Sequence, residues 1–118
     1  MRYICLVYAD PKAMGGLSAS ERATLIEDSL FYDDVLRRSG HFIVAHALES
    51  VQQAATVRVR NNKPAVTDGP FAETKEQLVG FILIEAKDND DAMQAASKIP
   101  MARHGSIEVR PIRNLNPS

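Results

Sequence analysis

Asp68, which opens the turn-forming run Asp68-Gly69-Pro70-Phe71, is the residue of this sequence best suited to act as a general base. A carboxylate serves as a base near neutral pH when a cleft removes it from water and raises its pKa. The competing interpretation is conformational, because an Asp side chain in such a turn commonly accepts backbone N–H groups. Phe71 likewise either lines a pocket with its flat ring or anchors the loop to the core. The residue types are compatible with both interpretations.

Polar side chains continue after this turn. Glu73 and Glu76 are close enough in sequence to share a proton. Thr74 and Gln77, however, have the spacing of a capping box that would start one helical turn. A structural role for Glu73 and Thr74 therefore competes with a role in binding.

Three more candidates lie elsewhere in the chain. Arg110 shares one face of a predicted strand with Glu108, and its guanidinium either holds a substrate carboxylate or pairs with an acid across the sheet. Tyr8 ends the first predicted strand and either donates its hydroxyl into a cleft or keeps it in water. Asp28 lies at the edge of the apolar stripe of a predicted helix. It is either a carboxylate with a shifted pKa that acts in catalysis or a half-exposed partner for an Arg or Tyr side chain.

The sequence lacks the motifs for metal, thiol, nucleotide-dependent and serine-hydrolase chemistry. His41 and His46 are five residues apart in a predicted strand, so they face opposite sides, and His104 has no neighbour at ligand spacing. Cys5 lies within an apolar strand, where a thiol is usually inert. The sequence contains no glycine-rich dinucleotide loop, P-loop or nucleophile elbow. We expect neither a metal site nor a cofactor.

Hydrophobic periodicity and turn residues predict the elements that must position these groups. Ser18 and Glu21 have capping-box spacing, and Gly40 is a suitable end for the helix that they begin. A second helix is predicted between Asp88 and Pro100. Strands are predicted over residues 2–9, 42–48, 55–60, 64–67, 78–86 and 106–112, with a tight turn at Asn61-Asn62. This order is typical of a ferredoxin-like α+β domain, whose antiparallel sheet carries two helices on one face.

Two helices cover one face of such a sheet, yet the strands over 2–9 and 78–86 are apolar on both faces. The simplest cover for the second face is the same face of another copy, so we expect an isologous homodimer. Ala23, Ile26 and Leu30 lie off the main stripe of the first helix and are either its exposed apolar remainder or a contact with another chain.

Composition limits the class of protein. The 118 residues fit one domain, predicted over residues 1–113 with a tail at 114–118. The 14 Lys and Arg balance 15 Asp and Glu to a net charge of -1, which argues against direct nucleic-acid or anionic-membrane binding. The sequence has one cysteine, no signal-peptide pattern and no apolar run of membrane-spanning length, so we expect a cytoplasmic protein.

The run from Asp68 to Leu78, DGPFAETKEQL, resembles the signature of DGPF-type YCII-related proteins, which are similar to the dimeric α+β barrel superfamily. Residues 2–8, 56–60 and 105–112 extend this resemblance along most of the chain. It implies a ferredoxin-like dimer with a polar cleft near the sheet and no cofactor. Some relatives occur beside or fused to extracytoplasmic-function sigma factors. Others carry a His–Asp pair with the His on the first helix, where this sequence has Ser29 beside Asp28.

We therefore expect a homodimer that binds a small polar or aromatic metabolite beside the loop 68–76 and performs cofactor-free acid–base chemistry. The catalytic candidates are Asp68 and Asp28, and the binding candidates are Tyr8, Phe71, Glu73, Thr74 and Arg110. The alternative is a non-catalytic sensor or accessory module that acts through a protein partner linked to sigma-factor-dependent transcription. Exposure of Ile26 and Leu30 would favour that alternative.

Overall fold

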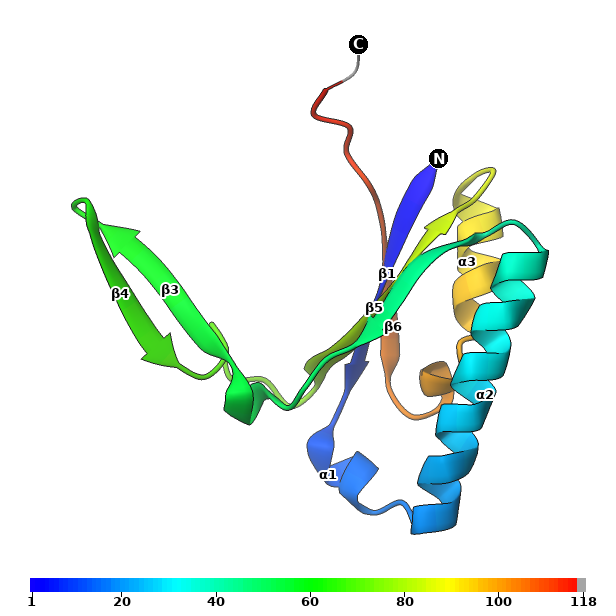
Figure 1. Ribbon diagram of the computed structural model, residues 1–118, viewed down its shortest axis with the longest axis horizontal. Coiled ribbons are helices and arrows are strands. Elements are labelled where there is room, and N and C mark those ends of the chain that lie inside the picture. Colours follow the sequence, from blue (N-terminus) through cyan, green and yellow to red (C-terminus); the bar gives the residue numbers. More distant parts are fainter. Residues whose placement is uncertain (117–118) are drawn as a thin grey trace.

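A four-stranded antiparallel sheet lies at the centre of the computed structural model, which describes residues 1–116 (Figure 1). Residues 117–118, the end of the predicted tail, lie outside the described residues. The strand order is β2-β5-β1-β6, and each neighbouring pair is antiparallel. The strands are β1 (Arg2–Ala9), β2 (Phe42–Ala47), β5 (Gln77–Glu85) and β6 (Ser106–Pro111).

Two helices, α2 (Ala19–Arg38) and α3 (Asn89–Ser97), lie on the same face of this sheet (Figure 1). This arrangement is the ferredoxin-like α+β fold that the order of elements predicted. The sheet of the single chain is open, with β2 and β6 at its edges.

The core lies between the helices and the sheet. Alternate residues of β1 and β5, such as Cys5 and Ile84, are buried against α2 and α3. The Tyr32 hydroxyl of α2 donates a buried 2.6 Å hydrogen bond to the Ala95 carbonyl oxygen of α3. The two helices are thus joined by a polar contact within an apolar layer.

Predicted residues cap the starts of both helices and mark the end of α2. Ser18 and Glu21 form the reciprocal capping box of α2, and Gly40 follows that helix with a φ of +81°. Asp88 caps α3 by accepting the backbone N–H of Asp91. These local signals placed both helix starts correctly because each satisfies backbone N–H groups that lack intrahelical partners.

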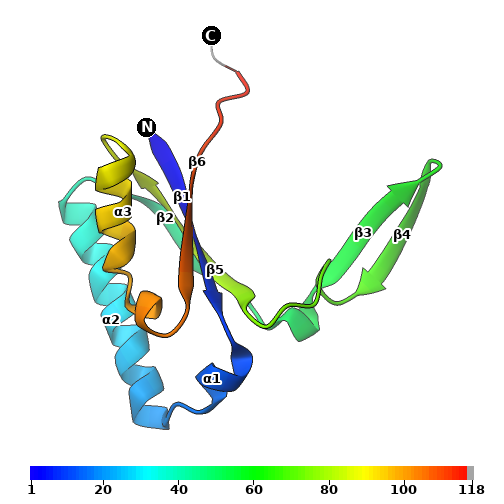
Figure 2. The ribbon, with the colours of Figure 1, turned by 180° about the vertical axis from the view of Figure 1, so that it is seen from behind.

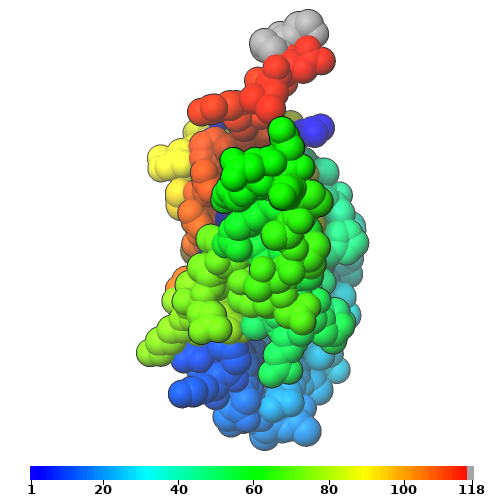
Figure 3. Space-filling view, turned by 90° about the vertical axis from the view of Figure 1, so that its left-hand side faces the viewer, coloured from blue at the N-terminus to red at the C-terminus, as the bar shows by residue number. Residues whose placement is uncertain are grey.

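The strands β3 (Ala55–Arg60) and β4 (Lys63–Asp68) form a hairpin of their own, the arm. Asn61 and Asn62 take positive φ at its tip, as the tight turn requires. The arm projects away from the body on the side opposite the helices (Figures 1 and 2), and Figure 3 shows it extending toward the viewer. The sequence predicted these strands but not their separation from the main sheet.

The segment after β1 also differs from the prediction. We interpreted Asp10-Pro11 only as the end of a strand, but it begins the short helix α1 (Pro11–Gly15). The Asp10 carboxylate accepts the Lys12 N–H, and proline occupies the first helical position, where its missing N–H costs nothing. Two 3-10 helices, η1 (Val51–Gln53) and η2 (Pro100–Arg103), complete the elements.

The second face of the sheet, here called the open face, has no helix over it. It carries the half-buried apolar side chains Ile4, Leu6, Phe81 and Leu83. Both faces of β1 and β5 are thus apolar, as predicted, and only one is covered within the chain. No helix within residues 1–116 is long and apolar enough to cross a membrane.

Candidate functional site

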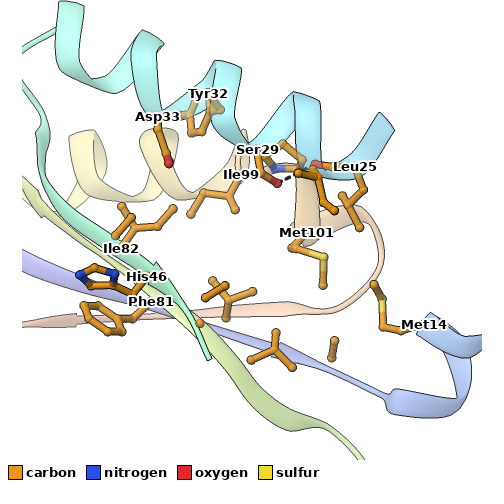
Figure 4. A pocket seen from close by; sticks show the side chains of 18 residues that line it. Met14, Leu25, Ser29, Tyr32, Asp33, His46, Phe81, Ile82, Ile99 and Met101 are labelled. Atoms are coloured by element: carbon orange, nitrogen blue, oxygen red, sulfur yellow. Dashed lines mark hydrogen bonds between the residues drawn. The ribbon is translucent and has the colours of Figure 1, made fainter. Parts of the chain in front are cut away.

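A cavity of about 490 Å³ lies between α2 and the sheet, and we call it the helix–sheet cavity (Figure 4). Its volume is within the range of small-molecule sites. Most of its lining is apolar and comes from β1, α2, β5 and η2, including Val7, Leu25, Ile82 and Met101. Such a lining favours a ligand with a substantial apolar or aromatic part.

Asp33 places a carboxyl in this apolar cavity. Its side chain projects from α2 toward the sheet (Figure 4). Burial raises the pKa of Asp33 above its usual value; Asp34 adds to this effect, and Arg37 opposes it. Within residues 1–116 the Asp33 carboxyl accepts no hydrogen bond, which leaves it available to a ligand.

The other polar residues of the cavity are already engaged in part. The Ser29 hydroxyl donates to the Leu25 carbonyl oxygen at 2.8 Å, so only its oxygen lone pairs can serve a ligand. The Tyr32 hydroxyl is committed to Ala95. His46 is exposed, and its ring packs against Phe81 with centroids 5.8 Å apart. Asp33 is therefore the group best placed to exchange a proton.

Helical geometry explains why Asp33 enters the cavity and Asp28 does not. Asp33 follows the buried Tyr32, about 100° further around α2, on the flank that faces the cavity. Asp28 lies on the other flank, is exposed, and lines a smaller hollow of about 240 Å³ with Arg103 and His104. Sequence reasoning missed Asp33. The usable signal was its spacing of four residues from Ser29, which puts both on one edge of the stripe.

Three of the predicted binding residues meet elsewhere. Tyr8, Phe71 and Thr74 line a hollow of about 780 Å³ at the base of the arm, the arm groove. Phe71 is 80 % exposed, so its ring does not anchor the loop to the core of this chain. The predicted helical turn at Thr74 does not form, and its hydroxyl instead donates to the Glu76 carbonyl oxygen.

Tyr8 also connects the arm groove to the open face. Its hydroxyl donates to Glu108 Oε1 at 3.3 Å. Partial burial, together with the negative charge of Glu108, raises the pKa of Tyr8, while Arg110 acts in the opposite direction. Arg110 lies opposite Ile4 in the register of β1 and β6. Tyr8 pairs with Ser106, so Arg110 lies four register positions away from it, and Arg110 does not line the arm groove.

The remaining candidates lie apart from both hollows. Asp68 is the exposed last residue of β4, opposite Ala55, and lines neither the helix–sheet cavity nor the arm groove. Glu73 is also exposed. Asp68 is therefore not buried within this chain, as a carboxylate that acts as a base near neutral pH would have to be. The catalytic roles of Asp68 and Asp28 stay predictions, and the described residues hold no group of three or more His, Cys, Asp or Glu arranged for a metal ion.

Fold and cavity together define a ferredoxin-like α+β protein with a carboxyl in an apolar, ligand-sized space. Residues 1–116 match the model of the YCII-related domain. The chain is also 34% identical over 119 residues to a protein of Rhizobium meliloti (strain 1021) described as uncharacterised, covering 99% of this chain and 96% of that one. The protein belongs to the YCII-related family, which confirms the resemblance seen in the sequence.

Proposed function

We propose that this protein binds a small, mainly apolar or aromatic molecule in the helix–sheet cavity and that Asp33 is its acid–base group. The observation that supports this most is the Asp33 carboxyl, which lies among apolar side chains, has a raised pKa and accepts no hydrogen bond from residues 1–116. Titratable groups perturbed in this way gather at functional sites.

The chemistry that suits such a carboxyl is proton transfer without a cofactor. A raised pKa makes Asp33 a better base toward a weakly acidic C–H, and its protonated form can donate to a carbonyl oxygen of a lactone or ketone. Apolar walls strengthen either interaction, because they keep water from competing for the carboxyl. Ser29 can accept a hydrogen bond from the same ligand through its free lone pairs.

A fragment titration followed by NMR tests this proposal. Small aromatic carbonyl compounds and lactones should shift amide signals of residues lining the cavity, and Asp33→Asn should weaken that binding at least tenfold. Glu27→Gln removes an equal charge from the exposed side of α2 and should leave binding unchanged. Compounds that shift no cavity signal, or that bind Asp33→Asn as well as wild type, would refute the proposal.

The proposal includes a homodimer in which a second copy covers the open face. The chain has an accessible surface of 8609 Å², whereas a compact monomer of its mass exposes about 6,300 Å². Its radius of gyration is 16.3 Å, against about 13.5 Å for a compact domain of this length. The excess surface comprises the open face and the arm, and a second copy would bury both.

A second candidate function rests on the outer surface of α2. Ile26, Leu30 and Phe31 are each more than 60 % exposed, which supports a non-catalytic module that acts through a protein partner. A link to sigma-factor-dependent transcription would then require direct binding. The test is association with a purified extracytoplasmic-function sigma factor, lost in the double variant Leu30→Asp, Phe31→Asp, which leaves the cavity-lining Ile26 unchanged; absence of any association would exclude this candidate.

A further inference from the structure

We propose that Ser39, His41 and Asp91 form a second reactive site, in which the Ser39 hydroxyl is a nucleophile toward small acyl esters. This site lies at the C-terminal end of α2, where that helix meets the start of α3. It is separate from the helix–sheet cavity and does not depend on the function proposed for Asp33.

The three side chains are in hydrogen-bond contact. Ser39 Oγ lies 2.6 Å from His41 Nδ1, and His41 Nε2 lies 3.0 and 3.1 Å from the two carboxylate oxygens of Asp91. A nucleophile, a base within reach and a third group that orients the base are the parts of an activated serine. His41 and Asp91 are largely shielded, with side chains 20% and 24% exposed.

Proton positions follow from the partners. The Lys87 N–H and His41 both donate to Asp91, and these bonds hold the pKa of Asp91 below its usual value. An ionised Asp91 only accepts, so His41 must carry its proton on Nε2. In the neutral ring Nδ1 then has a free lone pair, and Ser39 is positioned to donate to it. The Ser39 hydroxyl has a second acceptor, the Leu36 carbonyl oxygen at 3.1 Å, which also accepts the backbone N–H of His41; the 2.6 Å contact with Nδ1 is the shorter of the two.

The backbone around this site is well fixed, which preserves the spacing of the three groups. The backbone N–H of His41 donates to the Leu36 carbonyl oxygen, and the His41 carbonyl oxygen accepts the Glu85 N–H at 2.8 Å. Asp91 is held by α3 and by the Lys87 N–H. The base is therefore positioned by groups that do not belong to the substrate, as nucleophilic catalysis requires.

The adjoining cavity limits the substrate class. It has a volume of about 170 Å³ and is lined by Ser39, His41 and Asp91 together with Gln94 and Lys98. That space suits a short acyl group. Gln94 and Lys98 carry N–H donors that can stabilise the negative oxygen formed when Ser39 attacks a carbonyl.

The reaction balances with these groups alone. Ser39 Oγ bonds to the acyl carbon, its proton passes to His41 Nδ1, and the ester C–O bond breaks with its electron pair leaving on the alcohol oxygen. His41 then gives the proton to the leaving alkoxide or to solvent. Water, activated by His41 in the same way, releases the acid and restores Ser39. Asp91 does not touch the substrate and acts as a positioning residue through His41.

Acetylation of the full chain by p-nitrophenyl acetate tests the proposal, with the acetyl group located by peptide mass spectrometry. Ser18 and Ser20, exposed serines at the other end of α2, serve as references in the same digest; neither makes a hydrogen bond to a His, although His104 borders the same hollow as Ser20. Ser39 should be acetylated about 10²-fold faster than either, a typical contribution of a general base. Ser39→Ala should remove the label from its peptide.

Substitutions at two positions separate chemistry from structure. His41→Gln keeps an N–H donor toward Asp91 and so preserves the link between α2 and α3, but it has no base and should reduce Ser39 to the reference rate. Asp91→Asn should slow acetylation, because its amide can donate to Nε2 and move the His41 proton to Nδ1, where the ring no longer accepts from Ser39; Asp91→Glu, which keeps a carboxylate, should restore part of the rate. A Ser39 rate equal to that of Ser20, or one unchanged in folded His41→Gln, would show that the three residues are only a structural link.

Discussion

Asp33 and its neighbour Asp34 differ in environment although one peptide bond separates them. Asp34 is exposed and pairs with Arg37 at 2.6 Å. Asp33 is half-buried beside the helix–sheet cavity, and burial raises its pKa. The contrast shows that the rotation of α2 about its axis, rather than residue type, decides which carboxyl becomes a candidate for proton transfer.

Asp33→Asn should stabilise the protein near neutral pH. A raised pKa in the folded state means that ionising Asp33 opposes folding once the pH exceeds that pKa, whereas below the unfolded value near 3.8 the carboxyl is protonated in both states. The variant should therefore have a higher Tm than wild type at pH 7, and the difference should vanish toward pH 3. Thermal unfolding at both pH values measures it, with Glu27→Gln as the control. A lower Tm for Asp33→Asn at pH 7 would contradict the assignment.

Tyr32→Phe should destabilise the fold by about 1 kcal/mol, because it removes a buried hydrogen bond and leaves the Ala95 carbonyl oxygen without that donor. Tyr3→Phe is a matched control, since the Tyr3 side chain is also buried but its hydroxyl has only a weak contact at 3.8 Å with the Met1 sulfur. Urea unfolding of both variants gives the two free energies. Equal losses would show that the hydroxyl of Tyr32 contributes nothing particular.

At the scale of elements, close backbone contacts fix where β6 begins. A Cβ added to Gly105 would lie 2.0 Å from the Tyr8 carbonyl oxygen, a distance that only a backbone shift can relieve. Gly105→Ala should destabilise the protein by about 3 kcal/mol, at the upper end of typical overpacking costs. Gly15→Ala, where the added atom meets nothing within 4 Å, should stabilise by about 0.5 kcal/mol instead. Denaturant midpoints of the two variants, which should move in opposite directions, are the measurement.

Local signals predicted most elements but not their partners. The capping box at Ser18 and the turn at Asn61-Asn62 satisfy backbone groups within a few residues, so they are readable from sequence. The pairing of the arm depends on what lies next to it in space. Its strands alternate apolar and polar residues just as sheet strands do, so the pattern could not show that they leave the main sheet.

The candidate site was less predictable for the same reason. The helix–sheet cavity combines residues from six separate elements, and Asp33 acquires its raised pKa from burial by residues distant in sequence. The signature run from Asp68 gave the family correctly, yet only Phe71 and Thr74 of its candidates line a hollow. A family signature in a turn indicates a shared chain path more directly than it indicates chemistry.

At the scale of the whole molecule, the uncovered surface sets the expectation for assembly. Light scattering should give twice the 13.0 kDa chain mass. Leu6→Lys should yield a folded monomer. The chain should still fold because the new ammonium lies opposite Glu108 in the sheet register. The dimer should not form because a second copy would bury this charge without a compensating partner. Leu30→Lys, on the exposed outer surface of α2, should leave the mass unchanged. A wild-type monomer at micromolar concentration would contradict the proposed covering of the open face.

The burial of Cys5 makes the chain convenient for spectroscopic labelling. Cys5 is its one cysteine, is 1% exposed, and burial raises its pKa to about 11, so the native thiol is poorly reactive toward maleimide or methanethiosulfonate reagents. A cysteine introduced at Asn62 on the tip of the arm would then take a single spin label without removal of the native residue. In an assembly of two copies, the distance between the two spin labels would show where the arm of each copy lies.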